Sequence, residues 1–329
     1  MDQKIYPVCV IGGGSAGTMA VLRTILNNDE CLFFPGSAKD KKRSRDLWVR
    51  KIENIPGHFH YKRGIQEPNL ETMKWILQSD FKDNLHTQKN TGVVSVEKQG
   101  DVFKIIDSKD QTHFAEYIIL CTGVMDVQPE IKGTIETVFD YANAQTIDYC
   151  LICDGHHVLN KRASVIGHGN GAAWSAIMLH ERYHPQDFHI LTNGKKADFS
   201  SDTQKLIDLY GIKVNEALII DIFGQEKGQI LEGFILEDGT TIETDICFIS
   251  MGMLIYNDIA RELGAELDDR GFVKGDEAGL TSVPGLYVAG DLKANTKKQI
   301  YTAWDTAVNS ANAINLKIRS KKRQQLLKE

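Results

Sequence analysis

The chain has 329 residues, of which 42% are hydrophobic and 25% charged, the composition of a globular protein with one large domain or two of ordinary size. Lysine and arginine number 38 against 44 aspartates and glutamates, a formal net charge of −6, which argues against nucleic acid as the main partner. No apolar run approaches the ~20 residues that span a bilayer. The chain begins without the layout of a signal peptide, so we expect a cytoplasmic protein with no membrane partner.

The first expected element is a strand, a glycine turn and a helix within residues 6–26, with Gly12, Gly14 and Gly17 in a G-x-G-x-x-G pattern. Gly12 permits the tight turn, Gly14 lets the backbone approach a pyrophosphate, and Gly17 lets the helix pack closely on the strand. The helix N-terminus supplies free N–H groups and a positive dipole end for the phosphates. The next apolar strand ends in Pro-Gly-Ser, with no acidic residue to hold a ribose, which weakens the case for NAD at this turn and leaves FAD.

Two cysteines, Cys150 and Cys153, precede a second glycine motif. They are interpreted as a redox dithiol, as half of a zinc site with His156 and His157, or as two core thiols. Adjacent histidines cannot easily both face one metal beside two cysteines in so short a loop, and no second C-x-x-C or spaced histidine pair follows, so we favour the dithiol and expect no metal. The remaining cysteines lie inside apolar runs and are expected to be buried, inert thiols: Cys9, Cys31, Cys121 and Cys247.

The second glycine motif, at Gly167, Gly169 and Ala172, lies about 155 residues after the first and indicates a second nucleotide-binding fold. Near the C-terminus a strand ends at Gly290-Asp291, and a helix begins near Gln299-Ile300. An aspartate at a strand end can bind the ribityl or phosphate chain of a flavin, and a helix N-terminus can stabilise negative charge on a reduced flavin ring. One nucleotide-binding domain therefore interrupts the other.

Together these motifs resemble the low-molecular-weight thioredoxin reductases, which are two-domain flavoprotein disulfide reductases, over residues 12 to about 316. The matching segments occur in the family's order: the first glycine turn, IENIPGH at 52–58, CTG at 121–123, the dithiol-Asp-Gly segment at 150–155, and TSVPGLYVAGD at 281–291. The resemblance implies a homodimer that binds FAD. The implied FAD-binding residues are Gly12, Gly14, Gly17, Asn54, Thr122, Gly123, Gly290, Asp291, Gln299 and Ile300.

The resemblance also implies the fold: α/β, with two Rossmann-like (three-layer ββα) nucleotide-binding domains, the second inserted in the first. The FAD-binding domain would comprise residues 1–120 and 248–329. The inserted NAD(P)H-binding-like domain would comprise residues 121–247 and carry the dithiol.

The resemblance assigns a role to each residue of the dithiol segment. Cys153 is the sulfur next to the flavin, Cys150 attacks the disulfide of thioredoxin or a similar small protein, and Asp154 is the proton donor and acceptor. Exchange then runs through a mixed disulfide. His156 and His157 replace the aromatic or apolar residues usual at these positions; either one of them tunes the thiolate charge or they are loop histidines without a role.

The second nucleotide site departs from the family's pattern. Residues 192–194 (TNG) replace a His-Arg-Arg run whose arginines hold the 2′-phosphate of NADPH, and Lys195 and Lys196 follow two or three residues late. Trp174 and Ser175 replace an acidic pair, so the indole fills the space of a nicotinamide. We expect a degenerate site at Gly167, Gly169, Ala172 and Trp174 and doubt that NADPH is the donor; the alternative is a variant that still binds NADPH weakly.

A reduced ferredoxin is another donor, as in the ferredoxin-linked relatives of this family. Residues 39–45 (KDKKRSR) hold five cations that would steer an acidic partner, although a solvated basic loop explains the same run. We therefore predict an FAD-dependent disulfide reductase. The alternatives are an ordinary NADPH-dependent thioredoxin reductase, an FAD-dependent dithiol oxidase that passes electrons to oxygen, and a non-catalytic flavin redox sensor.

Overall fold

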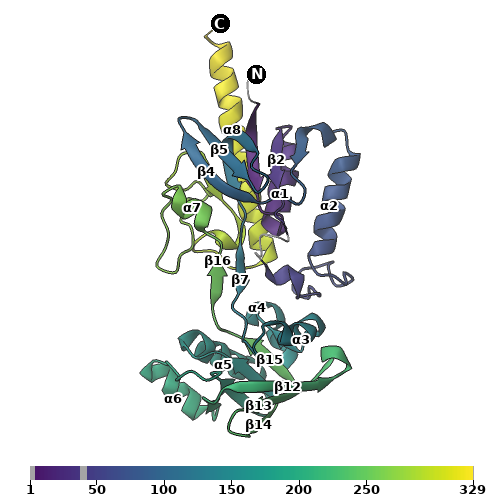
Figure 1. Ribbon diagram of the computed structural model, residues 1–329, viewed down its shortest axis with the longest axis vertical. Coiled ribbons are helices and arrows are strands. Elements are labelled where there is room, and N and C mark those ends of the chain that lie inside the picture. Colours follow the sequence, from purple (N-terminus) through teal and green to yellow (C-terminus); the bar gives the residue numbers. More distant parts are fainter. Residues whose placement is uncertain (1–3, 38–42, 329) are drawn as a thin grey trace. The chain divides into compact units, whose positions relative to one another are not determined.

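The computed structural model describes residues 4–37 and 43–328 (Figure 1). They form two compact units. Unit 1 comprises the described parts of Met1–Ser44, Gln66–Met125 and Ile255–Glu329. Unit 2 comprises Arg45–Ile65 and Asp126–Leu254.

Unit 1 is built on a seven-stranded sheet of order β3-β2-β1-β6-β5-β4, in which β17 also pairs with β6. Strands β3, β2, β1, β6 and β17 run parallel, whereas β5 and β4 are antiparallel additions. Strand β6 pairs with β5 through its first half and with β17 through its last three residues. The strands are β1 (Ile5–Ile11), β2 (Cys31–Phe34), β3 (Leu85–Thr87), β4 (Val93–Gln99), β5 (Val102–Asp107), β6 (Thr112–Leu120) and β17 (Leu286–Val288).

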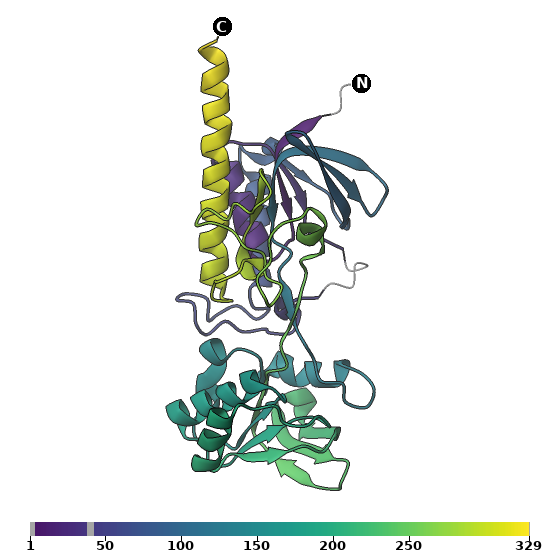
Figure 2. The ribbon, with the colours of Figure 1, turned by 90° about the vertical axis from the view of Figure 1, so that its left-hand side faces the viewer.

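Alternate side chains of β1 enter two different cores, as the period of a strand requires. Val8 and Val10 pack with α1 (Ser15–Leu26) and α8 (Ile300–Leu326), whereas Cys9 and Ile11 pack with α7 (Asp258–Glu262) and with side chains of β5 and β17. Helices α1 and α8 lie against each other, with the long α8 clearest in Figure 2. Helix α2 (Gln66–Gln78) packs beside α1.

Unit 2 contains a five-stranded parallel sheet of order β11-β10-β9-β15-β8. Its strands are β8 (Ile147–Asp148), β9 (Ala163–Ile166), β10 (Phe188–Leu191), β11 (Lys213–Asn215) and β15 (Ile246–Ile249). Helix α5 (Asn170–Tyr183) packs on β9 and β10 and contacts α6 (Ser201–Leu209). A second, antiparallel sheet consists of β12 (Ile219–Gln225), β13 (Ile230–Leu236) and β14 (Thr241–Glu243).

The predicted fold class, two Rossmann-like α/β units with the second inserted in the first, is confirmed. The prediction that Cys9, Cys31, Cys121 and Cys247 are buried thiols is also confirmed. Burial raises the pKa of each of these thiols, which keeps them in the unreactive protonated form. Within residues 4–37 and 43–328, no helix combines the length and the apolar character needed to cross a membrane.

The chain passes between the units within β7 (Val124–Asp126) and β16 (Met253–Ile255), two short strands that pair with each other. The domain boundaries expected from the sequence, after residues 120 and 247, lie a few residues before these strands. The segment Arg45–Ile65 groups with unit 2, whereas the sequence-based division assigned it to the FAD-binding domain because it precedes the first crossing.

Contacts within unit 2 explain why this segment groups there. Arg45 forms an ion pair with Asp126, with an Nη2–Oδ1 distance of 2.5 Å. The indole of Trp48 is 2% exposed and stacks on the ring of Phe139, with 5.3 Å between ring centroids. Phe139 begins α3 (Phe139–Ala144). An aromatic residue buried in this way contributes several kcal/mol to folding.

Replacing Trp48 with alanine should therefore destabilise unit 2. Because the substitution removes a buried, stacked indole, we expect a loss of about 3–5 kcal/mol in the free energy of unfolding measured in urea. The matched control is Trp75→Ala, since Trp75 is 50% exposed and its loss should cost far less. Equal, small effects of the two substitutions would contradict the packing of Arg45–Ile65 described here.

Candidate active site

The two cysteines of the C-x-x-C motif are joined by a disulfide across a single turn of helix. Cys150 precedes α4 (Leu151–Asp154) as its N-cap, and its Sγ accepts a hydrogen bond from the backbone N–H of Cys153 at 3.1 Å. Cys150 is buried, and Cys153 is partly exposed. In this form the sulfurs are bonded to each other and are not zinc ligands. The structure shows the pair in the oxidised state of a dithiol.

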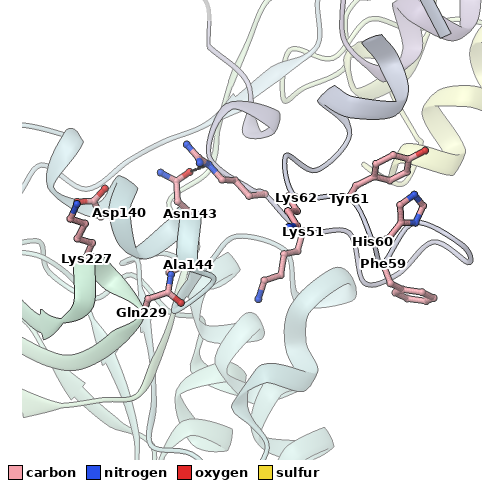
Figure 3. Close-up of a pocket in the computed structure, with 11 residues that line it drawn as sticks. Lys51, Phe59, His60, Tyr61, Lys62, Asp140, Asn143, Ala144, Lys227 and Gln229 are labelled. Carbon is pink, nitrogen blue, oxygen red and sulfur yellow. Dashed lines mark hydrogen bonds between the residues drawn. The ribbon is translucent and has the colours of Figure 1, made fainter. Parts of the chain in front are cut away.

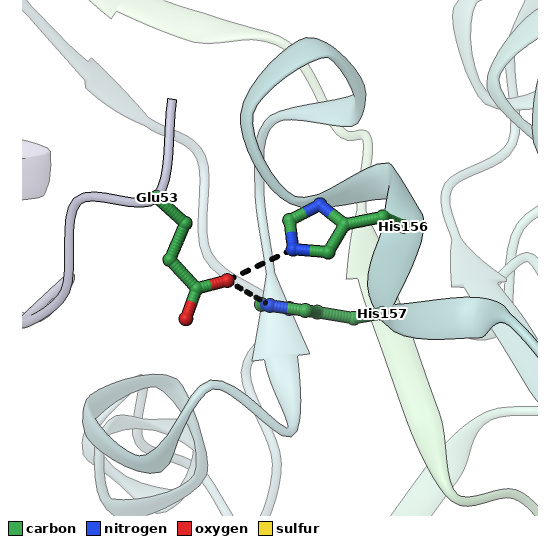
Figure 4. A group of neighbouring side chains, drawn as sticks. All are labelled: Glu53, His156 and His157. Atoms are coloured by element: carbon green, nitrogen blue, oxygen red, sulfur yellow. Dashed lines mark hydrogen bonds and ion pairs between the residues drawn. The ribbon is translucent and has the colours of Figure 1, made fainter. Parts of the chain in front are cut away.

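Three ionisable side chains form a hydrogen-bonded chain in the same unit: Asp148 at the end of β8, His157 in the short helix η5 (Gly155–Val158), and Glu53. The Nδ1 atom of His157 lies 2.8 Å from Asp148 Oδ2, and its Nε2 atom lies 2.8 Å from Glu53 Oε2. The same Glu53 oxygen also lies 2.9 Å from Nε2 of His156 (Figure 4). The two adjacent histidine rings therefore converge on one carboxylate oxygen.

Both histidines meet a carboxylate oxygen, and neither cysteine belongs to this group. Their ring centroids are 4.4 Å apart and the rings are inclined by 60°, so both Nε2 atoms reach Glu53. His157 and His156 are therefore paired with Glu53, and the tuning of the thiolate charge by one of them stays a prediction.

Burial and neighbouring charges set the protonation of this cluster. Burial alone lowers the pKa of His157, but its hydrogen bonds to Asp148 and Glu53 outweigh that effect and raise the pKa to about 9. An imidazole with a carboxylate at each nitrogen donates from both, which only the imidazolium can do. Burial raises the pKa of Asp148, although the bond from His157 opposes the rise.

Asp154, the residue assigned as proton donor and acceptor, is 3% exposed. Burial, followed by the nearby charge of Asp148, raises its pKa to about 7. A carboxyl group with a pKa near neutrality can release and accept a proton at physiological pH, which is the requirement for general acid–base catalysis. Asp154 directly follows Cys153 and is the last residue of α4.

The first glycine turn lies in unit 1 between β1 and α1. A Cβ atom on Gly12 would lie 2.2 Å from the backbone oxygen of Cys121, and one on Gly17 would lie 1.7 Å from the backbone oxygen of Gly12. Both positions therefore require glycine. A Cβ on Gly14 would meet nothing within 4 Å, so the turn leaves open space at the position where a pyrophosphate approaches.

The other predicted FAD residues of unit 1 lie at the C-terminal ends of its strands. Gly290 follows β17 with a positive φ of 72°, and a Cβ there would lie 2.6 Å from that of Ala16 in α1. Asp291 comes next, and Gln299 is the N-cap of α8, which Ile300 begins. Thr122 donates from Oγ1 to the backbone oxygen of Tyr256 at 2.7 Å, and Gly123 follows it. Asn54 belongs to Arg45–Ile65 of unit 2.

The second glycine turn joins β9 to α5. A Cβ on Gly167 would lie 2.3 Å from the backbone oxygen of Ser250, whereas Gly169 faces nothing within 4 Å. Ala172 is buried, and Trp174 in the first turns of α5 is 47% exposed. The turn itself therefore has the form of a nucleotide site.

The loop after β10, where a 2′-phosphate would be held, lacks the arginines of the family's pattern. Asn193 accepts a hydrogen bond from the backbone N–H of Ile219 at 3.0 Å, so its side chain is engaged within the protein. Glu216 accepts from the backbone N–H of Ala197, and the backbone of Asp198 bridges to Gly169. The loop therefore contacts the carboxylate of Glu216, which follows β11, and itself carries the exposed side chains of Lys195 and Lys196.

Unit 2 also holds a pocket of about 530 Å³ (Figure 3). Its charged lining is mostly basic, since Arg50, Lys51, Lys62 and Lys227 outnumber Asp140. Two aromatic side chains, Phe59 and Tyr61, add to the lining, together with His60, Asn143, Ala144 and Gln229. Concave basic surfaces with aromatic groups favour anionic partners.

Comparison with known proteins places this geometry in a family. A model of the pyridine nucleotide-disulphide oxidoreductase family matches residues 6–311. Thioredoxin reductases from Mycoplasma genitalium and Ureaplasma parvum are 28% and 27% identical over 318 and 323 residues, covering 94% of this chain each time and 94% and 96% of the relatives. The crystal structure of thioredoxin reductase from Streptococcus pyogenes shares the fold with a TM-score of 0.82 at 20% identity, covering 96% of this chain and 99% of the other.

The chain therefore belongs to the pyridine nucleotide-disulphide oxidoreductase family and is a flavin-dependent disulfide oxidoreductase. Within that class it is of the low-molecular-weight thioredoxin reductase type, whose cofactor is FAD. The open space at Gly14 fits such a dinucleotide.

The stability of unit 2 should fall as the pH rises above neutrality. Folding raises the pKa of His157 from 6.5 to about 9, so its contribution is fully present below pH 6.5 and is lost as the pH rises through 9. We expect a loss of about 2–3 kcal/mol in the urea-derived free energy of unfolding across that window, which His157→Gln should abolish. His60→Gln, at an exposed histidine, is the control; a wild-type pH slope retained in His157→Gln would contradict the assignment.

Proposed function

We propose that this enzyme passes electrons from FAD through Cys150 and Cys153 to the disulfide of thioredoxin or a similar small protein, and that its electron donor is not NADPH. The observation that carries the first part is the disulfide closed across α4 with the buried, titratable carboxyl of Asp154 directly after it. The relatives named thioredoxin reductase support the choice of partner. The homodimer implied by the family resemblance is part of the proposal.

The proposed disulfide exchange balances in electrons and protons. Reduction of one disulfide takes up two electrons and two protons, and bound FAD, once reduced by the electron donor, would supply the electron pair. The Cys150 thiolate then attacks a partner sulfur, so that a Cys150–partner bond forms and the first partner thiolate leaves. Cys153 attacks Cys150, which restores the internal disulfide and releases the second partner thiolate. Asp154 gives and regains the proton that Cys153 needs.

For the cofactor, we propose that unit 1 is the FAD-binding domain. The pyrophosphate would lie against Gly12, Gly14 and the N-terminus of α1. Asp291 and the N-terminus of α8, at Gln299 and Ile300, would bind the rest of the flavin, together with Thr122 and Gly123. Asn54 would contribute from the segment that groups with unit 2. That Cys153 lies beside the flavin stays a prediction.

The loop after β10 supports the proposal that NADPH is not the electron donor. Residues 192–194 contain no arginine, and Asn193 is engaged with Ile219. The Glu216 carboxylate, which accepts from the backbone of Ala197, brings negative charge to a loop where a 2′-phosphate would need positive charge. The second nucleotide turn, with Gly167, Gly169, Ala172 and Trp174, is in this proposal a degenerate site.

A reduced ferredoxin, which is acidic and delivers single electrons, is the proposed donor class. Of the basic run at residues 39–45, residues 39–42 lie outside the described residues, and Arg45 is paired with Asp126. The basic pocket with Lys51, Lys62 and Lys227 supplies a further positive surface suited to such a partner.

Serine substitutions should separate the roles of the two cysteines. Cys150→Ser should abolish reduction of the partner disulfide and leave Cys153 as a thiolate beside the flavin, which a long-wavelength charge-transfer band would report. Cys153→Ser should trap a mixed disulfide between Cys150 and the partner, visible by mass spectrometry. Cys247→Ser, at a buried free cysteine, is the control. Full disulfide reductase activity in both dithiol variants would refute the assignment.

Anaerobic titration should identify the donor. Each lost charge-assisted hydrogen bond weakens binding by roughly 1.5–3 kcal/mol, so the loss of two or three lowers the affinity for NADPH by about 10³-fold or more. Millimolar NADPH should therefore bleach the flavin slowly or not at all, whereas reduced ferredoxin should bleach it rapidly, and faster at low salt. Rapid stoichiometric bleaching by micromolar NADPH would show an ordinary NADPH-dependent enzyme instead.

A further inference from the structure

The buried carboxyl of Asp154 needs a path to solvent if it is to serve repeated disulfide exchange. Each cycle passes protons through this group, and Asp154 is only 3% exposed. We propose that Asp148, His157, Glu53 and His156 form a proton relay between Asp154 and solvent. This inference rests on the proposed function of the dithiol and adds positioning residues to it.

The hydrogen-bonded chain runs steadily outward. The side-chain exposures are 1% for Asp148, 15% for His157, 30% for Glu53 and 50% for His156. Successive members are joined at 2.8 Å, 2.8 Å and 2.9 Å. The chain therefore leads from the interior of unit 2 to its surface without a gap between these four residues.

His157 is the central member because its two ring nitrogens face opposite ways along the chain. Its Nδ1 atom faces the inner carboxylate of Asp148. Its Nε2 atom faces the outer carboxylate of Glu53 (Figure 4). The imidazolium in this position releases a proton from one nitrogen and then regains one at the other. No bond other than N–H and O–H bonds is made or broken.

The inner end of the relay reaches Asp154 over a short distance. Carboxylate oxygens of Asp148 and Asp154 and a ring nitrogen of His157 all lie within 4.8 Å of one another. Two hydrogen bonds through one bridging water span such a separation. A proton released at Asp154 can therefore reach the pair of Asp148 and His157.

The charges around the relay keep a proton available in it. Asp148, Glu53 and Asp154 all raise the pKa of His157. Asp148 and Glu53 also raise the pKa of Asp154, whereas the positive charges of Arg45 and His157 lower it. The outermost ring, His156, bonds to Glu53 and is half exposed, so it exchanges protons with water. The pattern differs from a simple surface ion pair because one carboxylate of the chain, Asp148, is fully buried.

The reaction of the flavoprotein with dithiothreitol tests the relay without a protein partner. Dithiothreitol gives two electrons and two protons to the Cys150–Cys153 disulfide, and the resulting dithiol passes two electrons and one proton to the oxidised flavin. The second proton must leave to solvent. Bleaching of the flavin absorbance in stopped flow, in weak buffer at neutral pH, therefore reports the proton step together with electron transfer.

We expect His156→Gln and Glu53→Gln to slow bleaching by at least about tenfold, within the range that proton transfer contributes to enzymic reactions. Added imidazole should restore the rate in proportion to its concentration, because it carries the proton in place of the missing side chain. His184→Gln, at an exposed histidine of unit 2 outside the relay, should bleach at the wild-type rate.

Wild-type rates in both variants would overturn the relay, and so would slow bleaching that imidazole does not restore, since that result indicates a structural role. A chelator that changes the wild-type rate would also overturn it, because Glu53, His156 and His157 would then hold a metal. A wild-type flavoprotein that dithiothreitol does not bleach would refute the proposed function itself, which keeps the two failures distinct.

Discussion

Unit 2, which carries the dithiol, depends on how it stabilises the negative charge of two buried carboxyl groups. Asp148 and Asp154 are both nearly inaccessible to solvent, and two buried carboxylates close together are costly unless one is protonated or a cation lies between them. His157 supplies that cation, and Glu53 holds its outer face. Burial, followed by the nearby charge of Asp148, raises the pKa of Asp154 to about 7, so the carboxyl that directly follows Cys153 in the chain titrates near neutrality.

Close approach of backbone segments determines the form of the two glycine turns. At Gly12, Gly17 and Gly167 the backbone of another segment occupies the space of a side chain, so the strand and helix meet closely and the helix N-terminus stays open. The two turns are alike in backbone but differ in their surroundings. A Cβ on Gly290 would meet Ala16 of α1 at the first turn, whereas near the second turn Glu216 and Asn193 bond to the backbone of neighbouring segments.

The sequence predicted the parts that depend on local pattern. Glycine spacing and alternating apolar strands indicated both Rossmann-like units, and C-x-x-C-D identified the dithiol and its neighbouring acid. It did not reveal Glu53, because the contact with His157 joins residues 104 positions apart and a lone glutamate in a loop has no periodic signal. Asp148 was missed for a related reason, since β8 has only two residues and its burial comes from pairing with β15. The convergence of His156 and His157 depends on rotamers that spacing alone does not determine.

The charge state of His157 is the most direct test of this arrangement. Nitrogen-15 NMR of the histidine-labelled protein reports whether each ring nitrogen carries a proton, and comparison with His157→Gln assigns the signal. Both ring nitrogens of His157 should be protonated at neutral pH, with the proton lost only near pH 9. A neutral ring at pH 7.5, titrating close to the ordinary value of 6.5, would show that no cation balances the buried carboxyl groups and would contradict the account of the site.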